Sequence, residues 1–510
     1  MDYTIDQQKA IDVRGKNILV AAAAGSGKTR VLVERIIKQL MERELSIDEL
    51  LVVTFTSAAA AEMRERIEGA LQKRLLVEEN AALSAWLERQ TVLLTGADIS
   101  TFHSFCQQVI RKNIEAVEVD PQFRLAGEQE MVLLKRDVLE ELLEKRYERP
   151  ELAEAIPAWE EFLSFADDYG NDRGDDAIYE AVLKLYDFSQ SQPYPKAWLN
   201  RQRETYELAD CLFTTPWFQR ILSGAVLEID ACIRQYDQLT MLVGDGAPVA
   251  LQEEWKPYVE AVQADIDQLE AVRGALRICE KRPAAGCFDA VQEAARQVSW
   301  VRLAKKEFKA LKADYPEVRD RFDQARDKVK KSFGKVKEKY LQEGEEELWH
   351  SIKGSGKAVK QYVQLVLDFI DALQAAKKER NILDFNDLEH FALEILCGDA
   401  EKIMQDEPEY VPTAAAISLR EQYKEIMVDE YQDTNGVQEA ILNLIAREAN
   451  RFTVGDVKQS IYRFRLADPY LFQAKYDSFP EECRNGEANQ LITMKKHFLC
   501  HRSLWILLFS

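Results

Sequence analysis

The stretch "ILVAAAAGSGKTRVLVERI", Ile18 to Ile36, decides the fold. Its first three residues predict a short buried strand, and after Thr29 the apolar residues recur at helical spacing. Between these two segments lie four alanines, two glycines, a lysine and a threonine. A strand, a tight turn of small residues and a helix, in this order, are typical of a phosphate-binding loop, because small residues let backbone N–H groups converge on a phosphate at the helix N-terminus.

The residues of this turn form the candidate nucleotide site. Ala22 stands where the general loop pattern has its first glycine. The Lys28 ammonium would carry positive charge to the β- and γ-phosphates, and the Thr29 hydroxyl would be a ligand for Mg²⁺. A similar set of letters at 354–357 follows no strand, and we expect a plain loop there. The candidate nucleotide-binding residues of the first loop are Ala22, Ala23, Ala24, Gly25, Ser26, Gly27, Lys28, Thr29 and Arg30.

Further short apolar runs predict the rest of a sheet. Each is followed by a polar turn, and helical patterns separate them, so we expect an α/β fold with helices on both faces of a parallel sheet. Ligands of such sheets lie at the carboxyl ends of the strands. The predicted strands lie at 18–20, 50–55, 99–102, 425–428 and 452–454.

The strands fall into two groups, and the long segment between them has helical periodicity, as in "QEMVLLKRDVLEELLEKRYE" at 129–148. A chain of 510 residues exceeds what one core usually organises. We therefore predict a helical domain inserted into a sheet domain. The sheet domain would comprise residues 1–120 and 381–490, and the insertion residues 121–380.

Composition limits the class of protein. Hydrophobic residues at 46% and charged residues at 30% are typical of a globular protein in water. No apolar run reaches the length of about 18 residues that a membrane span needs, and the N-terminus has no signal-peptide pattern. The eight cysteines include no Cys-x-x-Cys pair, which argues against a zinc ribbon and favours a reducing compartment. We expect a cytoplasmic protein without a membrane partner.

The net charge of −21 seems unsuited to nucleic acid. Binding depends on local fields within about a Debye length, however, roughly 8 Å at physiological salt. Residues 302–340 form a basic stretch with five closely spaced lysines between 328 and 337. Two interpretations stay open for this stretch, a solvated helix face and a surface that tracks DNA.

A second apolar strand ends in two carboxylates within "EIMVDEYQDTNGVQ", Glu425 to Gln438. A nucleotide on the first loop needs Mg²⁺, a carboxylate at the next strand end to hold the metal, and a second carboxylate to polarise the attacking water. Asp429 suits the first role and Glu430 the second. With Lys28, Glu430 is therefore a candidate catalytic residue.

Two other sequence elements predict contacts to the γ-phosphate and to DNA. In "FTVGDVKQSIYRFR", 452–465, Gln459 could reach the γ-phosphate as a third catalytic residue, and nearby aromatic residues could stack on bases. The turns after the strands at 50–55 and 99–102 could hold a DNA backbone. Core packing for the aromatics and a structural role for the turns are the alternatives. The candidate DNA-binding residues are Thr56, Thr101, Phe102, His103, Tyr462, Phe464 and Arg465.

Together these motifs resemble the superfamily 1 helicases of the UvrD/Rep type, which have the RecA-like fold of P-loop NTPases. The wording "ILVAAAAGSGKT", "LLVVTFTSAAAAEM", "VDEYQDTN" and "VGDVKQSIYRFRLADP" is similar to the AddA family of bacterial helicase-nuclease subunits in particular. In that family the alanine at Ala22 is normal. The resemblance runs from about residue 3 to residue 475 and is weak inside the insertion.

The resemblance implies roles for individual residues. Gln7 would read the adenine of ATP, Lys28 and Thr29 would bind the triphosphate and Mg²⁺, and Asp429 and Glu430 would coordinate the metal and activate water. The family moves 3′ to 5′ along DNA, and its AddA members process double-strand breaks for recombinational repair with an AddB-like subunit. The expected partners are therefore single-stranded DNA, duplex DNA ends and this second protein.

The last residues depart from the family pattern. A motif of the type Asn-Tyr/Phe-Arg-Ser is expected after 488, but "KKHFLCHRSLWILLFS" stands there, with Leu499 in place of the arginine. Because such an arginine is worth on the order of 10³ to 10⁵ in rate, we expect slowed ATP hydrolysis. We interpret residues 491–510 as an aberrant tail from a truncation or frameshift. Without a second motor domain and the nuclease domain, we expect this chain not to unwind DNA alone.

Two other functions stay open. The chain could be a non-translocating ATP- and DNA-binding module that docks a partner protein. It could also be an ATPase that acts on a protein or a small molecule, although the stacking pair Tyr462 and Phe464 argues against that alternative.

Overall fold

The computed structural model describes residues 3–23, 25–170, 175–208, 211–243, 249–301, 316–405, 408–456, 467–482 and 487–494. It divides into two compact units, a sheet unit of residues 1–200 and 362–510 and a helical unit of residues 201–361. The boundaries between the units fall within helices α9 and α15, which are defined below.

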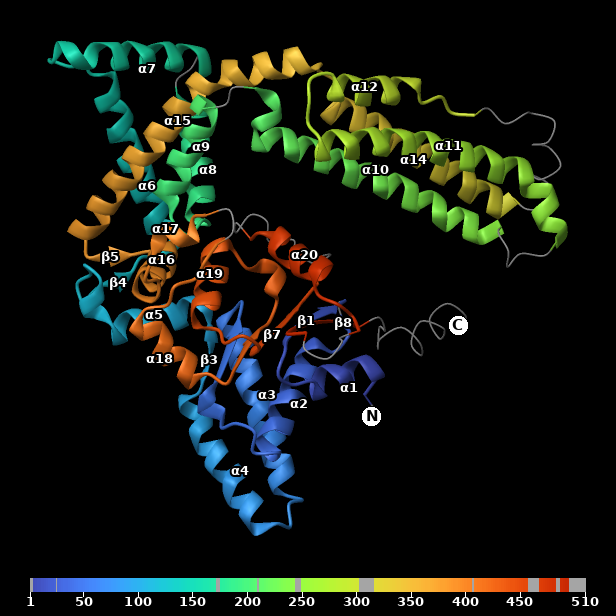
Figure 1. The fold of residues 1–510 in the computed structure, drawn as a ribbon. Coiled ribbons are helices and arrows are strands. Elements are labelled where there is room, and N and C mark those ends of the chain that lie inside the picture. Colours follow the sequence, from blue (N-terminus) through green and yellow to red (C-terminus); the bar gives the residue numbers. More distant parts are fainter. Residues whose placement is uncertain are drawn as a thin grey trace, which may run out of the picture. The chain divides into compact units, whose positions relative to one another are not determined.

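The sheet unit is built on six parallel strands in the order β3-β2-β6-β7-β1-β8 (Figure 1). Val20 of β1 lies between Val454 of β7 and Ile492 of β8. All five predicted strands are present, which confirms the α/β class. The sixth, β8, was not predicted. The strands are β1 (Asn17–Ala22), β2 (Leu50–Thr54), β3 (Asp98–Thr101), β6 (Glu425–Val428), β7 (Arg451–Gly455) and β8 (Asn489–Met494).

Helices cover both faces of this sheet. Successive strand residues point to opposite faces, and accordingly Leu19 belongs to one hydrophobic core while Ile18 and Val20 belong to another. The core around Leu19 contains residues of α5, α16 and α19, and the other contains residues of α1 to α4. The helices are α1 (Ile5–Asp12), α2 (Lys28–Met41), α3 (Ser57–Leu75), α4 (Ala81–Leu93), α5 (Phe102–Lys112), α16 (Phe385–Leu396), α17 (Ala400–Ile403), α18 (Ala414–Gln422), α19 (Gly436–Ile445) and α20 (Pro469–Ser478).

The segment between the two groups of strands is helical, as expected. It begins and ends beside two short strands that pair in parallel, β4 (Arg124–Leu125) and β5 (Ile382–Leu383). Its helices are α6 (Glu128–Tyr147), α7 (Ile156–Tyr169), α8 (Asp176–Gln190), α9 (Pro195–Leu208), α10 (Pro216–Val243), α11 (Val249–Lys281), α12 (Cys287–Gln297), α14 (Pro316–Tyr340) and α15 (Glu345–Glu379).

Two local expectations in this segment need correction. The second glycine-rich set, 354–357, lies inside α15 and is not a loop. A glycine inside a helix costs only about 1 kcal/mol relative to alanine, which the long helix outweighs. Cys279 and Cys287 form a disulfide with a Cα–Cα distance of 5.2 Å. Their spacing did not indicate this pair, because the turn between α11 and α12 brings the two sulfur atoms together.

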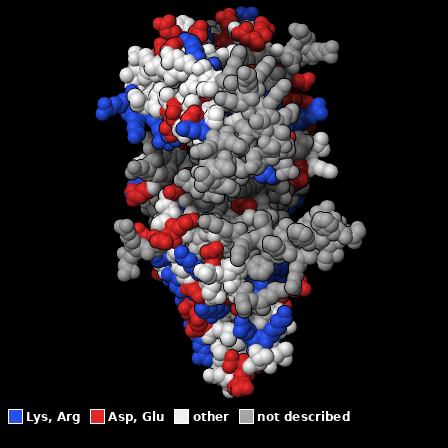
Figure 2. Space-filling model, turned by 90° about the vertical axis from the view of Figure 1, so that its right-hand side faces the viewer, with Lys and Arg blue, Asp and Glu red and all other residues white. Residues whose placement is uncertain are grey.

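The described half of the basic stretch forms α14, an amphipathic helix of the helical unit. Phe322, Val329 and Phe333 are buried in the unit's core. Cationic side chains occupy exposed positions along the same helix, and residues 302–315 lie outside the described residues. On the face drawn in Figure 2, acidic and basic side chains are interspersed over the described surface. The exposed cations are Arg321, Lys328, Lys331, Lys335 and Lys339.

No helix within the described ranges is both long enough and apolar enough to cross a membrane.

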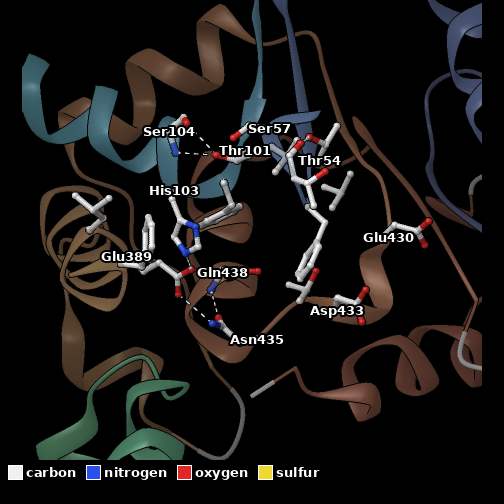
Figure 3. Close-up of a pocket in the computed structure, with 18 of the residues that line it drawn as sticks. Thr54, Ser57, Thr101, His103, Ser104, Glu389, Glu430, Asp433, Asn435 and Gln438 are labelled. Carbon is white, nitrogen blue, oxygen red and sulfur yellow. Dashed lines mark hydrogen bonds and ion pairs between the residues drawn. The ribbon is translucent and has the colours of Figure 1, made fainter. Parts of the chain in front are cut away.

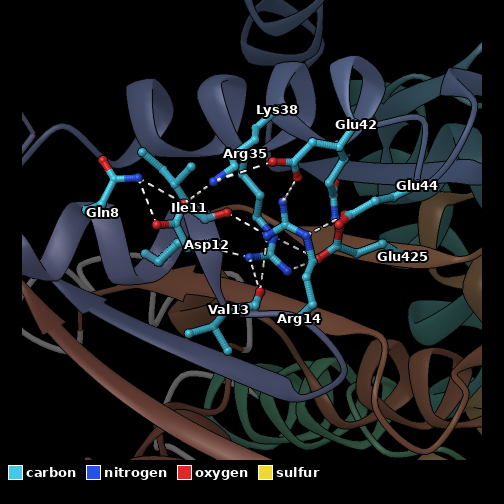
Figure 4. Close-up of polar contacts among 12 residues, drawn as sticks. Gln8, Ile11, Asp12, Val13, Arg14, Arg35, Lys38, Glu42, Glu44 and Glu425 are labelled. Carbon is cyan, nitrogen blue, oxygen red and sulfur yellow. Dashed lines mark hydrogen bonds and ion pairs between the residues drawn. The ribbon is translucent and has the colours of Figure 1, made fainter.

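A buried ion pair ties the N-terminal helix to the sheet (Figure 4). The Arg35 guanidinium of α2 donates to Glu425 Oε1 at 2.8 and 2.6 Å, and also to the backbone oxygens of Ala10 and Val13. The Gln39 amide donates to the other carboxylate oxygen of Glu425. Because Arg35 is 2% and Glu425 6% exposed, this network fixes α1, α2 and β6 to one another without help from water.

Candidate functional site

The glycine-rich turn joins the end of β1 to the start of α2. Gly25 and Gly27 have φ values of 72° and 86°, in the left-handed region that side chains with a Cβ disfavour. A Cβ at Gly27 would also lie 3.2 Å from the Gln7 amide nitrogen. Both glycines are therefore required by the backbone, and the turn directs the N-terminus of α2 toward its concave side.

The turn contacts the Gln7 side chain of α1. The Gln7 amide nitrogen donates to the Ser26 backbone oxygen at 2.9 Å. The Gln7 amide oxygen accepts from the Thr4 N–H at 3.0 Å, and the Thr4 hydroxyl accepts from the Gln7 N–H, which completes a capping box. The predicted adenine-reading residue is thus held against the loop. The next candidate along, Arg30, lies over the ring of Tyr3 at 4.5 Å.

Lys28 and Glu430 meet although 402 positions separate them along the chain. Lys28 Nζ lies 2.7 Å from Glu430 Oε2. Parallel strands with carboxyl ends at one edge make this meeting possible, because β1 and β6 both end there with β7 between them. The structure thus brings two of the three predicted catalytic side chains together.

Asp429 and Glu430 follow the last residue of β6. The Asp429 N–H donates to the Val53 backbone oxygen at 3.0 Å, which continues the pairing with β2. Burial, together with the negative charge of Glu430, raises the pKa of Asp429 to about 6. Glu430 has a φ of 52°, a strained backbone conformation for a residue with a side chain. Such strain is typical of residues whose placement matters for chemistry.

Gln432 holds the Glu430 carboxylate in place, and sequence reasoning did not single it out. Its amide nitrogen donates to Glu430 Oε2 at 2.8 Å, and its amide oxygen accepts from the Asp456 N–H at 2.9 Å. A Cβ at Gly455 would overlap the Gln432 amide oxygen. Gln432 therefore connects the ends of β6 and β7. Its place two residues after Glu430 was the available signal, but spacing alone does not show where an amide points.

We expect Gln432→Leu to lower kcat for ATP hydrolysis about 10- to 100-fold and to leave KM for ATP nearly unchanged. The substitution removes a hydrogen bond to a charged group, worth about 1.5–3 kcal/mol, without touching the phosphate loop. Steady-state kinetics of the purified chain would measure both constants. Gln72→Leu, on the exposed face of α3, is the matched control. An unchanged kcat in Gln432→Leu would show that this amide does not position Glu430.

The predicted DNA-contacting turns line a pocket of about 580 Å³ beside the carboxylates (Figure 3). Thr56 caps α3 and accepts from the Ala59 N–H, and Thr101 caps α5 and accepts from the Ser104 N–H. His103 projects from the first turn of α5. Phe102 also lines the pocket, but its residue is only 7% exposed, so most of its ring belongs to the core.

The pocket brings together residues from both parts of the sheet unit. Asp429 and Glu430 lie on its wall with Thr56, Thr101 and His103. His103 Nε2 lies 3.1 Å from Glu389 Oε1, a buried carboxylate of α16 that sequence reasoning also missed. The pocket therefore joins the candidate DNA-binding turns to the candidate catalytic carboxylates.

Several predicted site residues lie outside the described residues. Their roles stay predictions, as do those of Phe498 and Leu499. The strand β8 includes the first four residues of the segment that we interpret as an aberrant tail. The site residues concerned are Ala24, Gln459, Tyr462, Phe464 and Arg465.

Comparison with known proteins identifies the family. The model of the UvrD/REP helicase N-terminal domain matches residues 3–480. The chain belongs to the UvrD/REP helicase family. This membership confirms the resemblance drawn from the motifs, and it agrees with the P-loop type of parallel sheet. A UvrD/REP helicase domain implies use of ATP.

Curated relatives of this UvrD/REP chain share more than a third of its residues. A protein of Alkaliphilus oremlandii (strain OhILAs) is 38% identical over 97% of the chain, and one of Bacillus mycoides (strain KBAB4) is 39% identical over 97%. One of Lachnoclostridium phytofermentans is 37% identical over 94%. Each of the three is named as an ATP-dependent helicase/nuclease subunit. The chain spans 33–38% of the length of these relatives.

Proposed function

We propose that this chain binds and hydrolyses ATP as the first motor domain of a 3′-to-5′ DNA helicase subunit that acts in double-strand break repair and recombination. The contact between Lys28 and Glu430 carries the proposal. It places the phosphate-binding lysine beside a carboxylate that can accept a proton from water. The name of the relatives supports both the helicase and the repair assignment.

The residues at this site fit a magnesium nucleotide. The Thr29 hydroxyl and the Asp429 carboxylate are hard oxygen donors at the ends of β1 and β6, of the kind that Mg²⁺ prefers. A cation beside Asp429 would favour its ionised form despite burial. When bound, Mg²⁺ would neutralise charge on the phosphates. Lys28 would bind the β- and γ-phosphates, Glu430 would orient and deprotonate the attacking water, and Gln459 would contact the γ-phosphate.

The pocket beside the carboxylates is the proposed site for a DNA backbone. Thr56, Thr101 and His103 offer hydroxyl and imidazole groups to phosphate oxygens, and backbone N–H groups at the start of α3 and α5 add donors. In this proposal Tyr462 and Phe464 stack on bases and Arg465 links them to the ATP site. Single-stranded DNA is the track, and a duplex end is the substrate.

We further propose a heterodimer with an AddB-like subunit in the cytoplasm. The word "subunit" in the name of the relatives supports a partner, and the nuclease in that name would belong to the remaining length of such a protein. For the domains, we propose residues 1–120 and 381–490 as the motor domain and 121–380 as its insertion. The pairing of β4 with β5, at 124–125 and 382–383, supports these boundaries.

The test is ATP hydrolysis by the 510-residue chain with and without oligo-dT. We expect stimulation by the oligonucleotide, and we expect Lys28→Ala to lower the stimulated rate on the order of 10²-fold or more, because it removes a charge aimed at the transferring phosphate. Lys38→Ala, on the same helix but partly exposed and paired with Asp12, is the matched control. Hydrolysis that is insensitive to Lys28→Ala would contradict the proposal.

A further inference from the structure

A buried carboxylate lies between the proposed DNA site and the proposed catalytic site. Glu389 of α16 is 2% exposed. His103 Nε2 lies 3.1 Å from its Oε1, the Gln438 amide donates to the same oxygen at 2.7 Å, and the Asn435 amide donates to Oε2 at 2.9 Å. Figure 3 shows the three side chains converging on Glu389 from two different elements. A buried charge is stable only with such partners.

Glu389 retains its negative charge at this position. Burial raises the pKa of Glu389, but the hydrogen bonds from His103, Asn435 and Gln438 outweigh burial, and the net shift is downward. The carboxylate is therefore an acceptor for all three partners at once, and a change at one of them alters its hold on the other two.

One end of this network faces the pocket. His103 is a pocket-lining residue whose side chain is 38% exposed, and its ring packs against Phe385 at a centroid distance of 4.7 Å. A phosphate that reaches the pocket meets His103 before it meets Glu389. Because phosphate and carboxylate are both anions that attract an imidazole, the phosphate competes with Glu389 for His103.

The other end of the network fixes the turn that follows the catalytic carboxylates. Asn435 caps α19, since its amide oxygen accepts from the Gln438 N–H at 2.8 Å. Only the short helix η6 (Tyr431–Asp433) and Thr434 separate Asn435 from Glu430. Glu430 itself is held in a left-handed conformation. A shift of Asn435 therefore acts on a strained residue a few bonds away.

We propose that Glu389 is a positioning residue that couples occupancy of the pocket by a DNA backbone to the placement of Glu430 and hence to the nucleotide. This inference rests on the proposed function. It differs from a purely structural role of Glu389 in one measurable respect. A structural role predicts weaker folding or weaker binding of each ligand, whereas coupling predicts that each ligand still binds alone but no longer alters the affinity for the other.

The experiment measures the affinity of the 510-residue chain for a fluorescein-labelled oligo-dT with and without saturating Mg²⁺ and a slowly hydrolysed ATP analogue. We expect the wild-type affinity for the oligonucleotide to change on the order of tenfold with the analogue. Glu389→Gln keeps the volume but removes the charge. It should bind each ligand alone within about twofold of wild type, retain the wild-type melting temperature within about 2 °C, and reduce the tenfold change to nearly none.

Glu394→Gln, an exposed carboxylate on the same helix, should behave as wild type. Wild-type coupling in Glu389→Gln would overturn the inference, as would a wild-type chain that binds both ligands independently. Failure of the wild type to bind either ligand alone would instead overturn the proposed function. If Glu389→Gln does not fold, Gln438→Met removes one link only and should reduce the coupling partway, while unchanged coupling there would count against Glu389.

Discussion

Glu430→Gln is expected to lower the rate of ATP hydrolysis by about 10²- to 10⁴-fold, the usual contribution of a general base. The amide keeps the size of the side chain and can still contact Lys28, but it cannot accept a proton from water. Nucleotide affinity should stay within a few-fold of wild type, because the phosphate loop is untouched. Single-turnover hydrolysis and equilibrium binding of a fluorescent ATP analogue would separate these two effects.

Glu421→Gln, an exposed carboxylate of α18 in the same unit, is the control for this substitution and should hydrolyse ATP as the wild type does. A Glu430→Gln chain that binds the analogue normally and hydrolyses ATP at the wild-type rate would show that another group activates the water. Loss of binding together with hydrolysis would mean that the contact between Glu430 and Lys28 shapes the phosphate loop and does not serve the chemistry alone.

Glu425→Ala is expected to lower the free energy of unfolding of the sheet unit by about 3–5 kcal/mol. The substitution leaves the Arg35 guanidinium buried without its counterion, and an uncompensated buried charge is far more costly than the pair itself. Hydrogen exchange of peptides from α2 and β6 in increasing urea would measure this loss locally, so that the helical unit does not obscure it.

The same region contains a surface pair for comparison (Figure 4). Arg14 Nε lies 2.6 Å from Glu44 Oε2, and the Glu44 side chain is 40% exposed. Water and salt screen this pair, so Glu44→Ala should cost less than about 1 kcal/mol. Equal losses in Glu425→Ala and Glu44→Ala would contradict the view that burial sets the worth of the Arg35 pair.

The nucleotide loop and the two carboxylates could be predicted from the sequence because their chemistry is local. The order of strand, small-residue turn, lysine and threonine around Lys28 determines the loop by itself, since the glycines must adopt left-handed φ values wherever the chain places them. Asp429 and Glu430 were predictable for the same reason, because they directly follow a short apolar strand that must end at the ligand-binding edge of a parallel sheet.

The supporting residues could not be predicted in this way. Gln432 and Glu389 act through contacts to Asp456 and His103, which lie far along the chain from them or on other elements. A sequence shows that a glutamine or a glutamate is present but not which groups packing brings within hydrogen-bond distance of it. The strand β8 was missed for a similar reason, since its pairing partner β1 lies near the opposite end of the chain.

By itself, the sequence determined the class of the sheet, its five motif-bearing strands, the helical nature of the insertion and the residues at the phosphate loop. These follow from periodicity and turn chemistry within short windows. Only the tertiary structure decided that Lys28 meets Glu430, that Gln432 holds that carboxylate, and that Glu389 joins the pocket to the turn after it. Such contacts arise when strands distant in sequence align their carboxyl ends, and no local pattern encodes them.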